Sequence, residues 1–197
     1  MMTITHVDIW QYSIPMHPFE IATGTMHFAQ NIFIRIHVSD GIYGVGECSA
    51  FRMITGETQN TCFSMASDFA AIWKNKDASA IDERLDELNA FVAFNYTIKS
   101  AFDMALYDLA AKASNQPLYN YLGGFQKTIE TDITIGIDSP ENMSKKAAYF
   151  LTKGARIIKI KLGKSVNDDI ERVKGIRKAV GENMVLRVDA NQGWSYD

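Results

Sequence analysis

The sequence is poor in cysteine and has no long apolar run. Cys48 and Cys62 are its only cysteines and neither belongs to a CxxC pair, so neither a disulfide framework nor a zinc site is expected. No apolar stretch approaches the ~18 residues that cross a bilayer. The first ten residues, MMTITHVDIW, lack the basic and apolar regions of a signal peptide. A cytoplasmic location without a membrane partner is therefore expected.

Positive charge is not in excess either. Lysine and arginine total 20 against 23 acidic residues, for a net charge of −3, and a nucleic-acid partner is not expected without a basic footprint. GxGxxG and P-loop motifs are absent from the turns, which gives nucleotide binding no support. The hydrophobic fraction of 47% is typical of a globular protein with enough apolar material for a core.

Residues 1–127 contain strand patterns followed by helix patterns. The alternation predicts three strands, and the periodicity of apolar residues then predicts three helices. Asp40-Gly41 is a hairpin turn signal between the last two strands. This order is typical of an α+β domain. The expected strands cover residues 3–14, 31–40 and 41–48, and the expected helices cover residues 58–73, 80–91 and 97–114.

Residues 128–197 instead alternate between strands and helices, which predicts parallel strands. The first helix is well delimited, with Ser139 as N-cap, Pro140 at its first position and Gly154 after its end. A strand recurs roughly every 25 to 28 residues, as in a barrel or a doubly wound sheet. The expected strands cover residues 131–138, 155–162 and 184–191, and the expected helices cover 139–153 and 165–180.

Polar side chains are expected on one face of these strands. Lys159 and Lys161 alternate with the isoleucines of ARIIKIKL, and Asp189 and Asn191 hold the same place on the next strand. Thr134 shares this face on the first strand. A lysine pair in a strand also occurs at sheet edges, as protection against aggregation. The matching Asp-x-Asn favours a site at the carboxyl ends of the strands.

These residue types suit the removal of a proton next to a carboxylate. Two neighbouring ammonium groups disfavour each other's charged form, so Lys159 is expected to make Lys161 a usable base near neutral pH. Asp189 suits a hard divalent cation that would stabilise an enediolate. A lysine base with magnesium is the arrangement that is known from the enolase superfamily.

At these residues the chain resembles the muconate lactonizing subgroup of the enolase superfamily, and within it the dipeptide epimerases. The resemblance is carried by KIKLGK, LRVDANQGW and residues 100–124. It implies an α+β capping domain, residues 1–127, followed by the start of a modified (β/α)8 (TIM) barrel, residues 128–197. It also implies the following roles: Lys161 as acid/base, Lys159 as its electrostatic neighbour, Asp189 as the first Mg²⁺ ligand, Asn191 as a supporting group and Thr134 in the pocket.

Two loops of the capping domain are expected to cover the substrate. They are HPFEIATGTMHF, which contains Phe19, and FRMITGET, which contains Ile54. The resemblance implies that relatives acting on Ala-Glu carry an arginine in the first loop, where a gapless alignment places Gly24. No arginine occurs between Pro15 and Ile34. We therefore expect an epimerase of dipeptides with a neutral or hydrophobic second residue.

The length departs from the family pattern. About 70 residues follow residue 127, whereas a full barrel needs ~250. We expect the chain to be the N-terminal portion of a longer enzyme, with the remaining metal ligands and a second catalytic lysine beyond residue 197. A muconate-type cycloisomerase, an o-succinylbenzoate synthase and an inactive fragment completed by a partner are the alternatives. A homo-oligomer is also expected.

Overall fold

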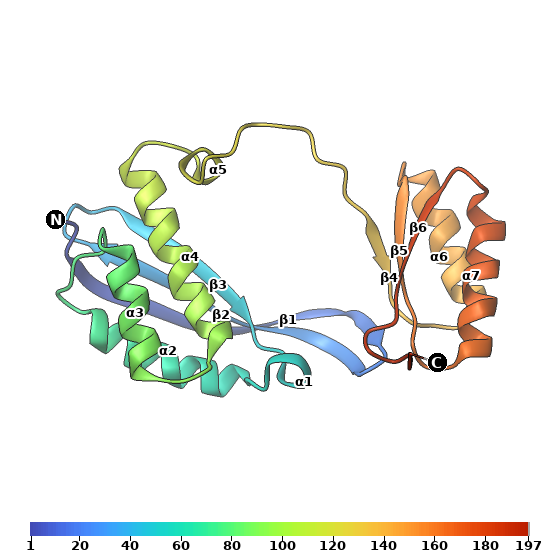
Figure 1. The fold of residues 1–197 in the computed structure, drawn as a ribbon, viewed down its shortest axis with the longest axis horizontal. Coiled ribbons are helices and arrows are strands. Elements are labelled where there is room, and N and C mark those ends of the chain that lie inside the picture. Colours follow the sequence, from blue (N-terminus) through green and yellow to red (C-terminus); the bar gives the residue numbers. More distant parts are fainter. Residues whose placement is uncertain (197) are drawn as a thin grey trace. The chain divides into compact units, whose positions relative to one another are not determined.

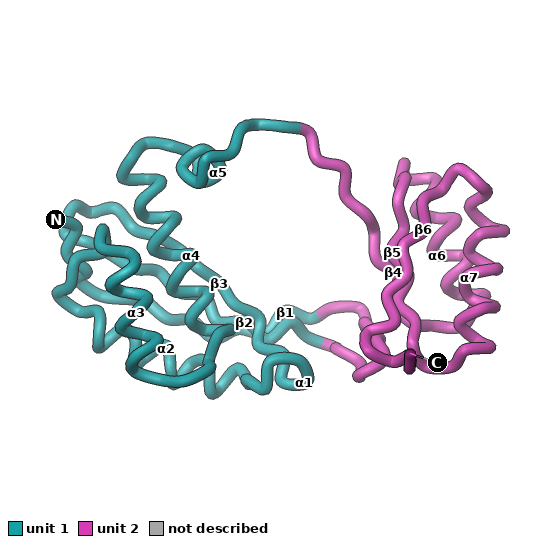
Figure 2. The backbone as a smooth tube through the Cα atoms, in the orientation of Figure 1, with its two compact units in different colours: residues 1–15, 28–127 teal, residues 16–27, 128–197 magenta. Residues whose placement is uncertain are grey.

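The computed structural model describes residues 1–196, which form two compact units. The first contains residues 1–15 and 28–127, and the second contains residues 16–27 and 128–197 (Figure 2). Each unit has a hydrophobic core of its own. Among the described residues, no helix combines the length and apolar character that a membrane crossing requires.

The first unit is built on a sheet with the strand order β1-β2-β3 (Figure 1). β2 pairs antiparallel with β3, and the turn at Asp40-Gly41 joins them as predicted. The predicted order of strands and then helices is confirmed, whereas two short helices, α1 and α5, were not expected. The elements are β1 (Ile4–Ile21), β2 (Gly24–Val38), β3 (Tyr43–Ser49), α1 (Arg52–Thr55), α2 (Gln59–Trp73), α3 (Ile81–Phe91), α4 (Tyr96–Ala113) and α5 (Leu118–Tyr121).

Alternation along β2 separates a buried face from an open one. Ile32, Ile34 and Ile36 are fully buried in the core that α2 and α4 cover. The residues that alternate with them, such as Arg35 and His37, lie on the opposite face of the sheet. Cys48 and Cys62 are buried free thiols in this core.

The prediction of a loop at residues 17–28 was wrong. β1 continues to Ile21 and β2 already begins at Gly24, so these residues form a β-hairpin with a two-residue turn. Ile21 is buried, and the amide of Ile137 donates a hydrogen bond to the Glu20 carbonyl oxygen at 2.8 Å. Because its backbone is paired and its apolar side chain is anchored, the segment is ordered as strand, and its tip belongs to the second unit.

The second unit is the predicted βαβαβ series. Its three parallel strands have the order β4-β5-β6, and α6 and α7 both cover one face of this sheet (Figure 1). The predicted N-cap is confirmed, because the Ser139 hydroxyl accepts a hydrogen bond from the amide of Asn142 at 3.2 Å. The elements are β4 (Ile133–Ile135), α6 (Pro140–Thr152), β5 (Ile157–Lys161), α7 (Val166–Val180) and β6 (Val185–Asp189).

The isoleucine side of β5 faces these helices. Ile158, Ile160 and Leu162 are buried against Met143 of α6 and Ile176 of α7. Burial of each such side chain stabilises the fold by about 1.5–3 kcal/mol. The side chains that alternate with them must therefore lie on the other face of the sheet.

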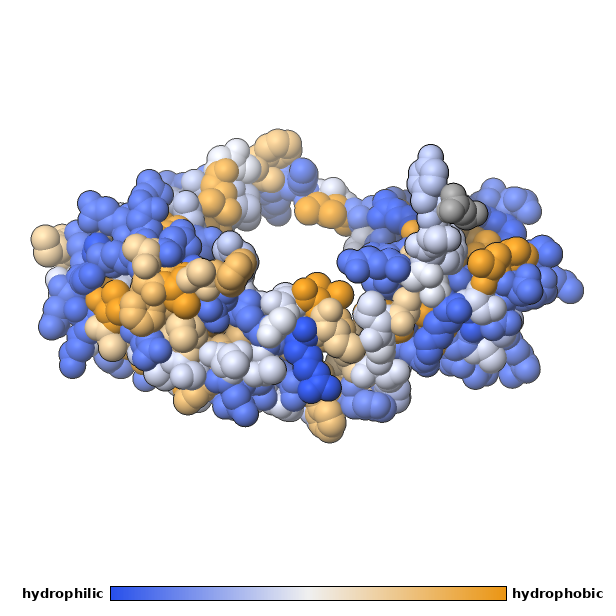
Figure 3. Space-filling model, turned by 60° about the horizontal axis from the view of Figure 1, so that its bottom comes forward, coloured by the Kyte–Doolittle hydropathy of each residue, from blue (hydrophilic) through white to orange (hydrophobic). Residues whose placement is uncertain are grey.

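The face shown in Figure 3 is mostly hydrophilic, with hydrophobic groups (orange) at the surface of both units. Phe94 and Phe125 of the first unit are each 73% exposed. Exposed aromatic side chains occur at protein interfaces, but two such residues do not define one. The homo-oligomer stays a prediction.

Candidate active site

Two lysines and one aspartate meet on the face of the second sheet that carries no helix. In the parallel register Lys161 of β5 lies opposite Asp189 of β6. The Nζ atom of Lys161 is 2.8 Å from Asp189 Oδ2, and that of Lys159 is 3.0 Å from the same oxygen. The Lys161 side chain is 12% exposed and the Lys159 side chain 34%. The expected convergence of these three groups is therefore present.

β5 is the central strand of the sheet, with β4 and β6 as its neighbours. The reading of the lysine pair as protection of an exposed edge is therefore wrong, because β5 has no free edge. The pair instead places two positive charges on the central strand, where partly buried ammonium groups need a charged partner. Asp189 supplies that partner to both.

The environment of Asp189 favours its ionised form. The hydrogen bond from Lys161 makes the largest contribution, followed by the backbone amide of Asn191 at 2.9 Å and then Lys159. Together they hold the pKa of the Asp189 carboxyl far below its usual range. The carboxylate therefore stays charged throughout the pH range of ordinary enzyme assays.

Asn191 brings a second oxygen to this end of β6. Its backbone adopts a positive φ of 46°, and its buried Oδ1 atom has no hydrogen-bond partner within the described residues. A buried acceptor without a partner is costly unless a donor or a cation approaches it. Carboxylate and amide oxygens are ligands of Mg²⁺, so the residues present fit a hard divalent cation.

The neighbouring hollow, of about 740 Å³, contains further polar groups. Thr134 of β4 lies opposite Lys159 in the register, on the same face of the sheet, but it does not line this hollow. Asp132 was not anticipated; its carboxylate is 2.9 Å from the guanidinium of Arg187 on β6. Its position two residues before Thr134 could have revealed it, because alternate residues share a face. The lining residues are Asp132, Lys159, Arg187, Val188, Asp189, Ala190, Asn191 and Gln192.

The hairpin tip reaches the carboxyl end of β4. A Cβ atom at Gly136 would lie 3.3 Å from the Phe19 ring and from the Glu20 backbone, so the glycine permits this close approach. Glu20 forms an ion pair with Lys164. Phe19 and Gly24 are both half-buried within the second unit.

Ile54, the expected contact from the other loop, lies in α1 of the first unit. Its side chain is 56% exposed. Its role in covering a substrate, like those of Phe19 and Gly24, stays a prediction.

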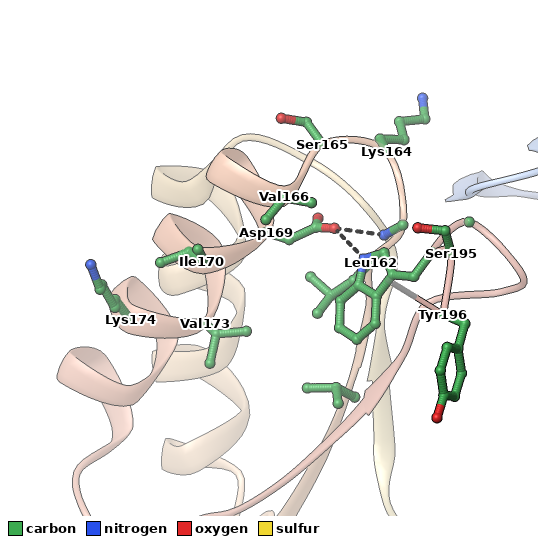
Figure 4. A pocket seen from close by; sticks show the side chains of 14 residues that line it. Leu162, Lys164, Ser165, Val166, Asp169, Ile170, Val173, Lys174, Ser195 and Tyr196 are labelled. Atoms are coloured by element: carbon green, nitrogen blue, oxygen red, sulfur yellow. Dashed lines mark hydrogen bonds between the residues drawn. The ribbon is translucent and has the colours of Figure 1, made fainter.

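A second hollow, of about 700 Å³, lies on the helix side of the sheet, between α7 and the segment after β6 (Figure 4). Its buried carboxylate, Asp169, accepts hydrogen bonds from Trp194 Nε1 at 3.0 Å and from the Gly163 amide at 2.9 Å. The other oxygen of Asp169 pairs with Arg172 at 2.9 Å. Because both oxygens are engaged, Asp169 fastens α7 to the strand ends and is a structural group.

Two family profiles match the chain. "Mandelate racemase / muconate lactonizing enzyme, N-terminal domain" matches residues 4–123, and "Enolase C-terminal domain-like" matches residues 142–197. The gap between the two matches, residues 124–141, contains β4 and the first residues of α6. These matches cover both compact units.

Among curated relatives, the D-Ala-D/L-Ala epimerase of Cytophaga hutchinsonii is 40% identical over 198 residues, which are 100% of this chain and 54% of that protein. The hydrophobic dipeptide epimerase of Enterococcus faecalis is 39% identical over 180 residues, 90% of this chain and 50% of that protein. The chain thus spans about half the length of these relatives.

Solved structures give the same result. The crystal structure of a dipeptide epimerase from Cytophaga hutchinsonii, in complex with Mg and the dipeptide D-Ala-L-Val, superposes with a TM-score of 0.96 at 40% identity. The match covers 98% of this chain and 53% of that one. The sheet order and the capping fold are therefore those of a known enzyme architecture.

Proposed function

Because the chain belongs to the mandelate racemase / muconate lactonizing enzyme family, we propose that the whole protein is a Mg²⁺-dependent dipeptide epimerase, an isomerase. The observation that carries the proposal is the approach of Lys161 and Lys159 to one oxygen of Asp189 at 2.8 and 3.0 Å. The names of the relatives, which are epimerases of dipeptides, give it support.

In this proposal Lys161 exchanges the α-proton on one face of the C-terminal residue of the dipeptide. Its side chain is better shielded than that of Lys159, and its Nζ atom lies 2.8 Å from Asp189. Lys159 places a second positive charge beside it, which attracts the carboxylate of the substrate. Thr134 lines the same face.

Asp189 would hold the Mg²⁺ ion, with Asn191 as the supporting oxygen donor. When it is bound, such a cation stabilises the negative charge that develops on the substrate carboxylate as the α-proton leaves. The lysines then need no longer share their carboxylate, because substrate and cation replace those contacts. In this proposal Asp189 therefore binds the cation, and Lys161 transfers the proton.

We further propose a neutral or hydrophobic second residue in the dipeptide. The hairpin tip presents Phe19 beside β4, and Gly24 provides no positive charge. Lys164 forms an ion pair with Glu20, so its positive charge is not free to bind an acidic side chain of the substrate. The apolar Phe19 ring then suits an apolar substrate group.

Replacement of Lys161 in the whole protein tests the proposal. K161A should abolish epimerisation, lowering kcat at least ~10³-fold, and should stop deuterium uptake from heavy water for substrate of one configuration. The matched control is K174A, which removes an exposed lysine on α7. Uptake from both epimers at the wild-type rate in K161A would remove Lys161 from the mechanism.

A further inference from the structure

Two histidines and an aspartate converge on the first sheet, in the compact unit that does not contain the lysine pair. His6 and Asp8 belong to β1 and His37 belongs to β2, and one ligand atom of each lies within 4.8 Å of the others. His37 Nε2 is 2.8 Å from Asp8 Oδ2, and His6 Nε2 is 4.0 Å from Asp8 Oδ1. Each oxygen of one carboxylate therefore faces an imidazole nitrogen.

The two rings stack on one another, with centroids 4.1 Å apart and planes that differ by 10°. Because the nitrogen lone pairs lie in nearly parallel ring planes, one ring has to rotate out of the stack before both histidines can bind one ion. Both lie on paired strands, which hold a binding group more firmly than a loop does. The Tyr43 ring packs against the other side of this arrangement, 5.8 Å from His37.

The Thr5 hydroxyl contacts both histidines, at 3.2 Å from the His37 carbonyl oxygen and 3.1 Å from His6 Nδ1. When the hydroxyl donates to that carbonyl, it accepts a hydrogen bond from His6 Nδ1, and the Nε2 atom of His6 is left with the lone pair that a metal ion needs. A lone pair facing a carboxylate at 4.0 Å is an arrangement that a cation between them would stabilise. A histidine whose other nitrogen is held by a hydrogen bond is the usual metal ligand.

We propose that His6, Asp8 and His37 form a Zn²⁺ site with an open fourth position. The scarcity of cysteine argued against zinc, but imidazole and carboxylate supply the ligands instead. Two nitrogens favour Zn²⁺ over Mg²⁺, which prefers oxygen. Ligand atoms around tetrahedral Zn²⁺ lie about 3.3 Å apart. The three ligand atoms, which already lie within 4.8 Å of one another, reach that spacing when one imidazole rotates out of the stack.

Binding has a defined cost and a defined effect. The hydrogen bond between His37 and Asp8 must be given up, and its proton must move to Nδ1 or to water. Arg35 is a nearby positive charge that would repel a metal ion. Its guanidinium carbon lies 5.2 Å from the ring centroid of Trp10 and 4.7 Å from that of Tyr43, so cation–π contacts with these rings stabilise its charge. The bound ion joins β1 to β2 and thereby stabilises the first unit.

Titration of the whole protein with Zn²⁺ in the presence of saturating Mg²⁺ tests the site. Calorimetry should show one Zn²⁺ per chain, and Zn²⁺ should raise the midpoint of thermal unfolding. H6A, H37A and D8N should each weaken binding at least ~10-fold and remove most of the thermal shift. Co²⁺ should give the visible absorption of a tetrahedral site in the wild-type protein and lose it in H6A.

Two controls separate this site from others. The double variant H17A/H27A removes the other two histidines of residues 1–197 and should bind Zn²⁺ as the wild type does. D189N, which alters the proposed Mg²⁺ site, should also retain Zn²⁺, and the result therefore does not depend on the proposed function. Wild-type affinity for Zn²⁺ in H6A or H37A, no binding in the wild type, or loss of binding in either control would overturn the proposal.

Discussion

At the scale of single residues, the environment of a carboxylate decides both its charge and its use. One oxygen of Asp189 pairs with two lysines, whereas both oxygens of Asp169 accept hydrogen bonds from structural partners. The same residue type thus has a chemical role on one face of the sheet and a structural role on the other. Asp138, at the start of α6, is a third case, and its effect on stability is measurable.

The carboxyl of Asp138 accepts hydrogen bonds from Asn142 and Lys146 and from the amide of Ser139, which lower its pKa to about 2. Its ordinary pKa is about 3.9, so the unfolded chain binds the proton more readily. Its contribution to stability is therefore complete above about pH 4 and is lost as the pH falls through about 2. D138N in the whole protein should flatten the slope of unfolding free energy against pH between these values.

Urea unfolding at a series of pH values measures that slope. K146A removes one of the three partners and should flatten it only in part. An unchanged slope in D138N would show that other groups carry the acid dependence.

At the scale of elements, the packing of α4 on β3 depends on two glycines. A Cβ atom at Gly46 would lie 2.8 Å from the carbonyl carbon of Ala101, and one at Gly44 would lie 2.8 Å from Leu109 Cβ. The strand and the helix approach backbone to backbone here, which a larger residue prevents. The two glycines thus allow α4 to pack closely against β3.

G46A should therefore destabilise the protein by about 1–3 kcal/mol, because the helix has to move away from the sheet. The change is measured by denaturant unfolding. V45A, on the same strand but with its side chain on the open face, is the matched control and should cost less. Equal stability of G46A and the wild type would mean that α4 adjusts at no cost.

At the scale of the whole molecule, the second unit is an open sheet. Within residues 1–196, β4 and β6 each pair with β5 alone, so each presents a free edge. Free edges of parallel strands lead to association between chains. The catalytic proposal needs groups beyond these residues, because its second lysine is expected there.

A polypeptide of these 197 residues alone should therefore self-associate and show no epimerase turnover. Sedimentation velocity over a range of concentrations measures the first, and proton exchange in heavy water measures the second. The whole protein at equal concentration is the control. A monodisperse, active 197-residue polypeptide would contradict the prediction, whereas recovery of activity with an added partner would support a completed fragment.

Substrate preference also belongs to the whole molecule. Across a dipeptide panel, kcat/KM should favour neutral or hydrophobic second residues, such as Ala-Val and Ala-Leu, over Ala-Glu. The hairpin tip has no arginine to pair with an acidic side chain, and such a bidentate pair is difficult to replace. A preference for Ala-Glu of tenfold or more, about 1.4 kcal/mol, would exclude this specificity.

The sequence by itself determined the features that depend on local repetition. Alternation along β5 and β6 placed Lys159, Lys161 and Asp189 on one face, because successive side chains of a strand point in opposite directions. Capping residues such as Ser139 located the helices, since they bond to amides a few positions away. Only the tertiary structure decided the features that join distant segments: the strand conformation of residues 17–28, the pairing of Asp132 with Arg187, and the meeting of His6 with His37. Those contacts depend on strand register and on the packing of whole elements, which a local sequence pattern does not predict.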